Sequence, residues 1–174
     1  MRLLHWNIHM WRDVEGGDNK RAVAELIDRV APDVVSLVEV DEPWGRPEGL
    51  RWLASELGYR WVFVPAFEYR GEGGFGNALL ARPPIQSAQQ WQLLSPRLYA
   101  GDERSEPRAV VLAEVSEGPG WWVGSTHLPR NDPAMRDAAS ARLLQLVERL
   151  GTPWVLCGDF NQPPTLWLPP PTHV

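Results

Sequence analysis

Short apolar runs alternate with amphipathic stretches in the first third of the chain. Leu3–Ile8 and Val34–Val38 have the length and bounded character of buried strands. Between them, apolar residues recur at helical spacing from Asn19, which stands in the N-cap position, to Pro32, which ends the helix. A second helix is predicted from Pro47 to Gly58. The pattern therefore predicts a β-α-β-α beginning.

Strands dominate the rest of the chain until one long helix near its end. The strands are predicted at Tyr59–Val64, Asn77–Ala81, Ile85–Leu93, Ala109–Val115, Trp121–Thr126 and Trp154–Cys157. Phe67–Gly76 is rich in glycine and charge and predicts a loop, and Ser95–Pro107 is polar and irregular. The helix is expected between Asp132, as its cap, and Gly151. This mixed order favours sheets with helices packed outside them over a purely parallel sheet.

Length and composition fit one compact domain over residues 1–174, with a proline-rich tail at 162–174 that we expect to be unstructured by itself. Hydrophobic residues make up 44% of the chain and charged residues 22%, as in ordinary globular proteins. Ten tryptophans against three tyrosines are unusual. Most of them lie in or beside apolar runs, which predicts packing in the core and against the sheets.

The net charge of −5 argues against a protein that binds nucleic acid or anionic membranes through its overall charge. An acidic balance suits a site that gathers carboxylates around a divalent cation. Five arginines in or near predicted loops form either a local phosphate track or an ordinary solvated surface: Arg70, Arg82, Arg97, Arg104 and Arg130.

A single cysteine, Cys157, excludes an intrachain disulfide and favours a reducing compartment. It lies in an apolar run and is expected to be a small buried hydrophobe. The first residues lack the apolar stretch of a signal peptide, and no segment has the length and hydropathy to span a membrane. We therefore expect a cytoplasmic protein.

Polar side chains with related chemistry follow four of the predicted strands. They are Asn7, Glu39, His127 and the pair Asp159 and Asn161. Strand ends are held by a rigid sheet while they face a cleft, where sites tend to be built. Glu39 offers a carboxylate and Asn7 an amide oxygen, the hard ligands that Mg²⁺ prefers. Asp159 could orient an attacking water, Asn161 could donate to a phosphoryl oxygen, and His127 could bind phosphate or move a proton.

Each of these residues has an ordinary structural explanation when it is taken singly. Asn7 could be a turn residue, Glu39 a solvated strand end, and His127 a histidine satisfied at a sheet edge. Asp159 and Asn161 could belong to an Asx turn. Five positions with matching chemistry at the ends of strands favour the functional interpretation.

Five motifs carry a specific resemblance, and they run in order from residue 4 to residue 163. They are Leu4-His5-Trp6-Asn7-Ile8-His9, Pro32–Asp41, Gly76–Arg82, Ser125-Thr126-His127-Leu128 and Gly158-Asp159-Phe160-Asn161. This set resembles the endonuclease/exonuclease/phosphatase (deoxyribonuclease-I-like) superfamily. The resemblance implies an α/β (α+β) fold, a four-layer α/β/β/α sandwich. It also implies Asn7 and Glu39 as ligands of Mg²⁺ or Mn²⁺, and Asn77 and Arg108 as residues that bind substrate.

The sequence departs from the family pattern at two places. Val38 stands where the family commonly has Gln before the metal-binding Glu, and this Gln is not a metal ligand. Family members also continue for several tens of residues to an Asp-His pair that completes the site. Here His173 follows Thr172, so it is not assigned that role. We expect residues 1–174 to be a truncated part of a longer enzyme that lacks the last strands of the second sheet.

The leading functional hypothesis is a divalent-metal-dependent phosphoesterase, endonuclease-like, in which activated water attacks the phosphorus of a phosphodiester or phosphomonoester. The alternative is a catalytically inactive remnant that only binds a phosphorylated ligand or a partner. The superfamily includes nucleases, sphingomyelinases and inositol-phosphate phosphatases, and the fold does not choose among these substrates. If the substrate is DNA, its affinity should fall steeply with added salt. The oligomeric state stays open.

Overall fold

The structure is a computed structural model that describes residues 1–43, 45–69, 73–94, 106–116, 120–150 and 153–162. Its strands are β1 (Leu3–Asn7), β2 (Val34–Pro43), β3 (Arg60–Tyr69), β4 (Gly73–Ala81), β5 (Ile85–Gln92), β6 (Ala109–Val115), β7 (Trp121–His127) and β8 (Trp154–Asp159). Its helices are α1 (Lys20–Val30), α2 (Glu48–Leu57) and α3 (Pro133–Val147), with short 3₁₀ turns η1 (His9–Trp11) and η4 (Glu148–Leu150).

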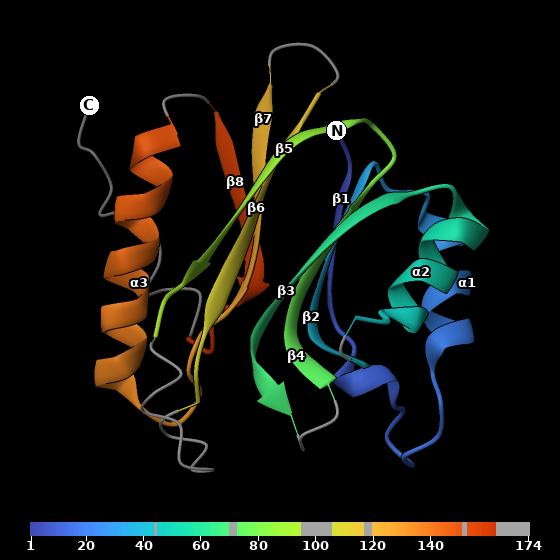
Figure 1. The fold of residues 1–174 in the computed structure, drawn as a ribbon, viewed down its shortest axis with the longest axis horizontal. Helices are drawn as coiled ribbons and strands as arrows, with labels where there is room; N and C mark the ends of the chain where they lie inside the picture. Colours follow the sequence, from blue (N-terminus) through green and yellow to red (C-terminus); the bar gives the residue numbers. More distant parts are fainter. Residues whose placement is uncertain (44, 70–72, 95–105, 117–119, 151–152, 163–174) are drawn as a thin grey trace.

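The strands form two four-stranded sheets that face each other, in the orders β1-β2-β4-β3 and β5-β6-β7-β8. Helices α1 and α2 cover the outer face of the first sheet, and α3 covers the outer face of the second (Figure 1). The pairs β1–β2 and β7–β8 are parallel, and the other pairs are antiparallel. The predicted four-layer α/β/β/α sandwich is confirmed.

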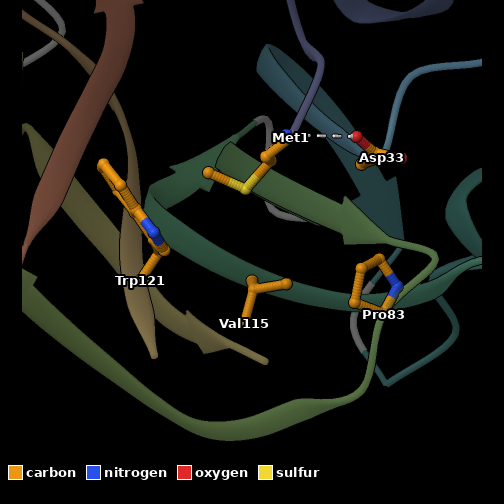
Figure 2. Close-up of a pocket in the computed structure, with 5 residues that line it drawn as sticks. All are labelled: Met1, Asp33, Pro83, Val115 and Trp121. Atoms are coloured by element: carbon orange, nitrogen blue, oxygen red, sulfur yellow. Dashed lines mark ion pairs between the residues drawn. The ribbon is translucent and has the colours of Figure 1, made fainter. Parts of the chain in front are cut away.

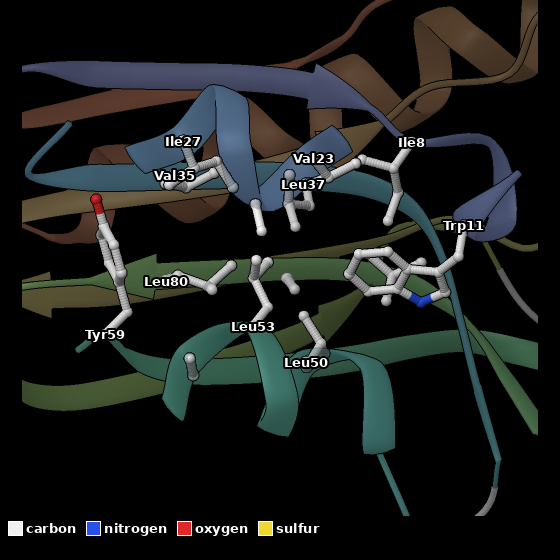
Figure 3. Packing of buried hydrophobic residues seen from close by; sticks show 14 residues of the cluster. Ile8, Trp11, Val23, Ile27, Val35, Leu37, Leu50, Leu53, Tyr59 and Leu80 are labelled. Carbon is white, nitrogen blue, oxygen red and sulfur yellow. The ribbon is translucent and has the colours of Figure 1, made fainter. Parts of the chain in front are cut away.

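Each of the three interfaces between these layers holds its own hydrophobic cluster. In the first, Ile27 of α1 and Leu53 of α2 pack on Leu80 of β4, and all three are fully buried (Figure 3). Full burial of one such side chain stabilises a fold by about 1.5–3 kcal/mol. Residues between the two sheets are mostly small or β-branched, such as Val111 and Ala113. The helical spacing of α1 and α2 and the short apolar runs of the strands were visible in the sequence.

The predicted helices are present, although one cap works differently. Gly58 closes α2 in the left-handed conformation, and the Asp132 carboxylate accepts the N–H of Met135 at the start of α3. Asn19 stands at the N-cap of α1, but its side chain makes no cap hydrogen bond. It donates instead to the carbonyls of Ile8 and Arg12. The helix therefore begins without the predicted cap because Asn19 holds the preceding turn.

The loop predicted over Phe67–Gly76 is wrong. Strand β3 runs to Tyr69 and β4 begins at Gly73, so only residues 70–72 of that segment lie outside the described part. A side chain at Gly76 would collide with the carbonyl of Val64, and one at Gly73 would collide with that of Glu42. These glycines permit close approach between strands, a role that a glycine-rich run does not distinguish from a turn.

The tryptophans and Cys157 are less buried than the sequence predicts. The tryptophans are not uniformly buried: four keep 37–40% of their surface exposed, namely Trp52, Trp91, Trp121 and Trp154. Cys157 is half-buried in β8, and burial raises the pKa of its thiol. Most of Ser95–Pro107, Gly151 and the tail from residue 163 lie outside the described residues. Across the described residues, no helix is both long enough and apolar enough to cross a membrane.

The topology brings the ends of β1, β7 and β8 and the middle of β2 to one end of the sandwich. In the first sheet, Asn7 at the end of β1 pairs with Val38 of β2, and in the second, His127 at the end of β7 pairs with Asp159 at the end of β8. A buried hydrogen bond of 2.7 Å between the hydroxyls of Ser36 and Ser125 joins the two sheets just below these ends. Residues far apart in the sequence therefore share one edge.

Candidate functional site

The amide of Asn7 and the carboxylate of Glu39 are in direct contact. Asn7 Nδ2 donates to Glu39 Oε1 at 2.8 Å, and Asn7 Oδ1 accepts the backbone N–H of His9 at 3.1 Å. This second hydrogen bond fixes which way the amide faces, since only its oxygen can accept from a backbone N–H. Asn7 therefore serves as a rigid link between β1, the following turn and Glu39.

Glu39 does not end its strand, contrary to the sequence prediction. The pairing of β2 with β4 shifts between Val38 and Val40, and the strand continues to Pro43. Glu39 adopts φ +56° at this irregularity. Such bulges re-aim side chains beside active sites and leave the extra residue outside the ladder. The bulge thus turns the carboxylate away from the ladder, where it keeps 19% of its surface exposed.

The turn that follows Asn7 is strained and carries a residue that the sequence interpretation missed. His9, Met10 and Trp11 have φ of 49°, 56° and 60°, a left-handed run that costs roughly 1–2 kcal/mol per residue. Burial of Trp11 in the first core and the two hydrogen bonds from Asn19 hold the turn. His9 Nδ1 consequently lies 3.3 Å from Glu39 Oε2. No periodicity or motif indicated this contact.

Residues with strained backbone conformations are concentrated at the end of the sandwich that carries Asn7, Glu39 and Asn161. Among the described residues, six non-glycine residues have positive φ, and all but Ala31 lie in the turn of residues 9–11 or at Glu39 and Asn161. Backbone strain of this kind persists only where the surrounding structure enforces it, and it is typical of functional sites. The distribution therefore marks the same end of the fold as the polar side chains do.

In the second sheet, Asn161 determines the tautomer of His127. Asn161 Nδ2 donates to Leu128 O at 2.8 Å and lies 3.0 Å from His127 Nε2. Since an amide nitrogen can only donate, Nε2 is the acceptor and the proton of the neutral ring resides on Nδ1. Asp159 Oδ1 accepts the N–H of Asn161, and Asp159 Oδ2 lies 3.7 Å from His127 Nε2.

His127 connects the two sheets at the site. Its Nδ1 lies 3.8 Å from Glu39 Oε1 and is buried without a hydrogen-bond partner among the described residues. Burial lowers the pKa of His127 to about 3, helped by the positive charge of Arg108 and opposed by Asp159. The ring is therefore neutral at neutral pH and presents an N–H donor beside Glu39. The structure thus brings together Asn7, Glu39, His127, Asp159 and Asn161.

Arg108 and Asn77 lie deeper than a substrate contact would usually be. Arg108 is 5% exposed and pairs with Glu106, while its Nε–H is buried without a partner among the described residues. Burial lowers the pKa of Arg108, and the charges of Glu106, Glu39 and Asp159 oppose that shift. Asn77 is 3% exposed and donates to the carbonyl of Ala109 at 2.9 Å, so it links β4 to the start of β6.

A second histidine missed in the sequence, His5, lies below the site on β1. Its Nδ1 is 3.0 Å from Ser36 Oγ, at the end of the hydroxyl chain that joins the sheets. Burial lowers the pKa of His5, and the carboxylate of Asp159 partly opposes that shift. Its place two residues before Asn7, on the same face of a strand, was the available signal. Three of the chain's four histidines therefore surround Glu39 and Asp159.

A divalent cation fits the donor chemistry of this end. Within the described segments, no three His, Cys, Asp or Glu side chains form a group that could hold a cation. Glu39 and the amide oxygen of Asn7 offer hard oxygen ligands, and Mg²⁺ commonly takes only one or two protein carboxylates, with water and phosphate as its remaining ligands. The unpartnered N–H groups of His127 and Arg108 would suit an anion beside that cation.

The described structure also contains a cavity at the opposite end of the sandwich. It has a volume of about 140 Å³ and is lined by Met1, Asp33, Pro83, Val115 and Trp121 (Figure 2). Met1 precedes β1 and Val115 ends β6, so this cavity lies away from Asn7 and His127. It shares no residue with the candidate site.

Comparisons with known proteins agree with this architecture. The model of the endonuclease/exonuclease/phosphatase family matches residues 4–172. No curated protein matches the chain. A solved endonuclease/exonuclease/phosphatase from Beutenbergia cavernae is 22% identical with a TM-score of 0.70, and the match covers 95% of this chain and 49% of that one.

Two further structures carry functional names. A mannosyl-6-phosphatase from Bacteroides thetaiotaomicron is 16% identical with a TM-score of 0.75, and the match covers 95% of this chain and 67% of that one. ANGEL2, a 2′,3′-cyclic phosphatase, is 20% identical with a TM-score of 0.68, and the match covers 83% of this chain and 44% of that one. The chain thus spans between about half and two thirds of the length of these structures, and their likeness shows the fold.

Proposed function

The chain belongs to the endonuclease/exonuclease/phosphatase family, and from this premise we propose that it hydrolyses phosphoester bonds by attack of a water beside a bound divalent cation. The observation that carries the proposal is the contact network around Glu39. This carboxylate lies 2.8 Å from the amide of Asn7 in its own sheet and 3.8 Å from His127 of the facing sheet. Two phosphatases among the structures of the same fold support phosphoester chemistry in general.

Asn7 and Glu39 would hold the cation, Mg²⁺ or Mn²⁺. When bound, the cation would neutralise the negative charge that develops on the phosphoryl oxygens. The role of Asn7 extends to Glu39 itself, since their hydrogen bond holds the carboxylate beside the end of β1. The bulge at Glu39 supports the same role because it frees this side chain from the sheet surface.

Asp159 would orient and activate the water. One of its oxygens is occupied by the N–H of Asn161, and the other lies beside His127. A carboxylate is an acceptor only, so it can take a hydrogen from the attacking water and direct the oxygen towards phosphorus. Asp159 retains 37% exposure of its side chain, which leaves it accessible to solvent.

His127 would donate a hydrogen bond from Nδ1 to a phosphoryl oxygen. The neutral ring with its proton on Nδ1 is suited to this task, because fixed donors aimed at developing charge stabilise a transition state. Asn161 would act mainly through His127, since its two amide hydrogens are engaged by Leu128 O and His127 Nε2. Arg108 would offer its unpartnered Nε–H to the same anion, and Asn77 would fix the start of the strand that follows Arg108.

The substrate class within this chemistry is a phosphomonoester or phosphodiester. Nucleic acid remains one candidate, although the net charge of −5 gives no support to tight nonspecific binding. If DNA is the substrate, its affinity should fall steeply between low and moderate salt, whereas a flat response would indicate a small or lipid substrate.

Turnover of p-nitrophenyl phosphate and bis(p-nitrophenyl) phosphate tests the proposal. We expect hydrolysis with Mg²⁺ or Mn²⁺ that stops with EDTA and falls by at least about 10²-fold in Glu39→Gln. Activity that resists both EDTA and the Glu39→Gln substitution would contradict the proposal. Binding of inorganic phosphate without any turnover would instead support the alternative of a chain that only binds phosphorylated ligands.

A further inference from the structure

His9 places an imidazole nitrogen beside Glu39. A Mg²⁺ site built from oxygen ligands alone would not need this nitrogen. We propose that His9 Nδ1 is a further ligand of the cation held by Asn7 and Glu39, and that this nitrogen makes the site favour Co²⁺ and Zn²⁺ over Mg²⁺. The inference rests on the proposed function, because it concerns the same cation. It adds a ligand and a metal preference that the oxygen donors alone do not provide.

The separation of the donor atoms fits a shared cation. His9 Nδ1 lies 3.3 Å from Glu39 Oε2. Two ligands that are each about 2.1 Å from a metal and at right angles to each other stand about 3 Å apart. The two atoms therefore already have nearly the spacing of neighbouring ligands. A cation between them would replace a weak exposed contact, since a histidine with 69% of its side chain exposed gains little from an ion pair.

The backbone of the turn fixes His9 in this place. His9 has φ +49°, and its backbone N–H donates to Asn7 Oδ1. This hydrogen bond fixes both the amide of Asn7 and the backbone of His9. Trp11, buried at 4% exposure, anchors the other end of the turn. Histidine belongs with Asn and Asp to the residues that are enriched in the left-handed region. The exposed ring is thus held beside Glu39 by a structured turn.

His9 is also the histidine whose nitrogen is open to a metal. His127 Nε2 accepts from Asn161, and its Nδ1 carries the proton. His5 Nδ1 is engaged with Ser36 Oγ below the site. In the described structure, the imidazole of His9 contacts Glu39 through Nδ1. The proposed ligand set is therefore one imidazole nitrogen, one carboxylate and one amide oxygen, with water and phosphate as the remaining ligands.

An imidazole nitrogen changes the metal preference of such a site. Carboxylate, carbonyl and water ligands suit Mg²⁺, whereas imidazole suits Zn²⁺ and other transition ions, whose affinities rise from Mn²⁺ to Cu²⁺. Removal of the nitrogen should therefore weaken the binding of Co²⁺ and Zn²⁺ much more than the binding of Mg²⁺. We expect the affinity for Co²⁺ and Zn²⁺ to fall by at least about 10-fold. This is the lower end of the change in metal affinity that follows the loss of a group around a bound metal.

The variants His9→Asn and His9→Asp test this ligand without releasing the turn, because Asn and Asp both tolerate positive φ. Isothermal titration with CoCl₂, ZnCl₂ and MgCl₂ measures the preference, and pulsed electron paramagnetic resonance of bound Mn²⁺ detects a coordinated imidazole ¹⁴N. We expect ¹⁴N coupling in the wild type, its loss in His9→Asn, and a shift of preference towards Mg²⁺ in His9→Asp. Thermal melting of each variant checks that the fold is retained.

The outcomes separate the two proposals. A cation that binds the wild type and is lost in Glu39→Gln, but shows no ¹⁴N coupling, would overturn the role of His9 and leave the proposed function standing. Coupling that persists in His9→Asn would assign the nitrogen to another histidine and also overturn the inference. Absence of cation binding in the wild type would overturn both.

Discussion

The side-chain amide of Asn7 donates to Glu39 Oε1 at 2.8 Å, and this contact joins the last residue of β1 to the bulge of the neighbouring strand β2. The oxygen of the same amide accepts the backbone N–H of His9. Asn7 therefore holds both Glu39 and His9, the two other proposed ligands of the cation. Asn7 therefore has both a binding role and a positioning role in our proposal.

Replacement of Asn7 by alanine should impair binding of the cation more than folding. We expect Asn7→Ala to weaken Mn²⁺ binding by about 10- to 100-fold, because Glu39 and His9 lose their common partner. The unfolding free energy should fall by about 1–2 kcal/mol. Titration calorimetry and denaturant unfolding measure the two effects. Gln90→Ala, which removes an exposed amide from β5, is the control and should change neither.

The positive φ of Glu39 leads to a prediction about stability. Glu39→Ala and Glu39→Gly both remove the carboxylate, but only glycine accepts φ +56° without strain. We expect the glycine variant to be more stable than the alanine variant by about 1 kcal/mol, and both to be inactive. Urea unfolding of the pair gives the difference directly. An alanine variant of equal or greater stability would show that Glu39 is not left-handed.

The low pKa of His127 predicts a dependence of stability on pH. Its folded value of about 3 lies below the ordinary value of 6.5, so between these values the unfolded chain binds a proton that the folded chain does not. This contribution is complete above pH 6.5 and is lost as the pH falls towards 3. We expect His127→Asn to reduce the slope of unfolding free energy between pH 4 and 6 by up to about 1.4 kcal/mol per pH unit.

Chemical denaturation of both proteins at several pH values measures that slope. A direct comparison at each pH cancels the contributions of titratable groups that do not interact with His127, whereas Asp159 and His5 do interact with it. Parallel curves for wild type and His127→Asn would mean that His127 titrates normally in the folded protein.

The Ser36–Ser125 hydrogen bond should help to hold the two halves of the site together. The two hydroxyls are buried and 2.7 Å apart, and Ser36 also contacts His5. We expect Ser36→Ala to cost about 1–2 kcal/mol, since His5 Nδ1 loses its contact and Ser125 Oγ loses its donor while it keeps its own bond to Leu37 O. A double-mutant cycle with Ser125→Ala should give a coupling free energy of at least about 0.5 kcal/mol. Additive losses would show that the hydroxyls act independently.

Much of this architecture was predictable because periodicity and local chemistry agree. Helical spacing located α1, α2 and α3, and short apolar runs located most strands. The extents of β3 and β4 were not predictable, because Gly73 and Gly76 serve close strand approach and resemble loop residues in a sequence. The bulge at Glu39 was missed for a related reason, since a register shift depends on the partner strand.

The candidate site was predictable where motifs carried it and not where tertiary structure alone created it. Asn7, Glu39, His127, Asp159 and Asn161 were selected from strand ends and motifs, and the structure brings them together. His9 reaches Glu39 only through a left-handed turn, and His5 acts only through a serine pair that spans both sheets. The contact of His9 has no local signature in the sequence, and the signal for His5 was limited to its place two residues before Asn7 on the same strand face.

A Mn²⁺ soak of crystals, read by anomalous diffraction, tests the shared cation site most directly. We expect one strong peak about 2.0–2.3 Å from a Glu39 carboxylate oxygen, within coordination distance of Asn7 and on the side of Glu39 that faces Asp159. A peak elsewhere, or crystals that bind no Mn²⁺ while Glu39 remains accessible, would contradict the cation site on which the proposed hydrolysis depends.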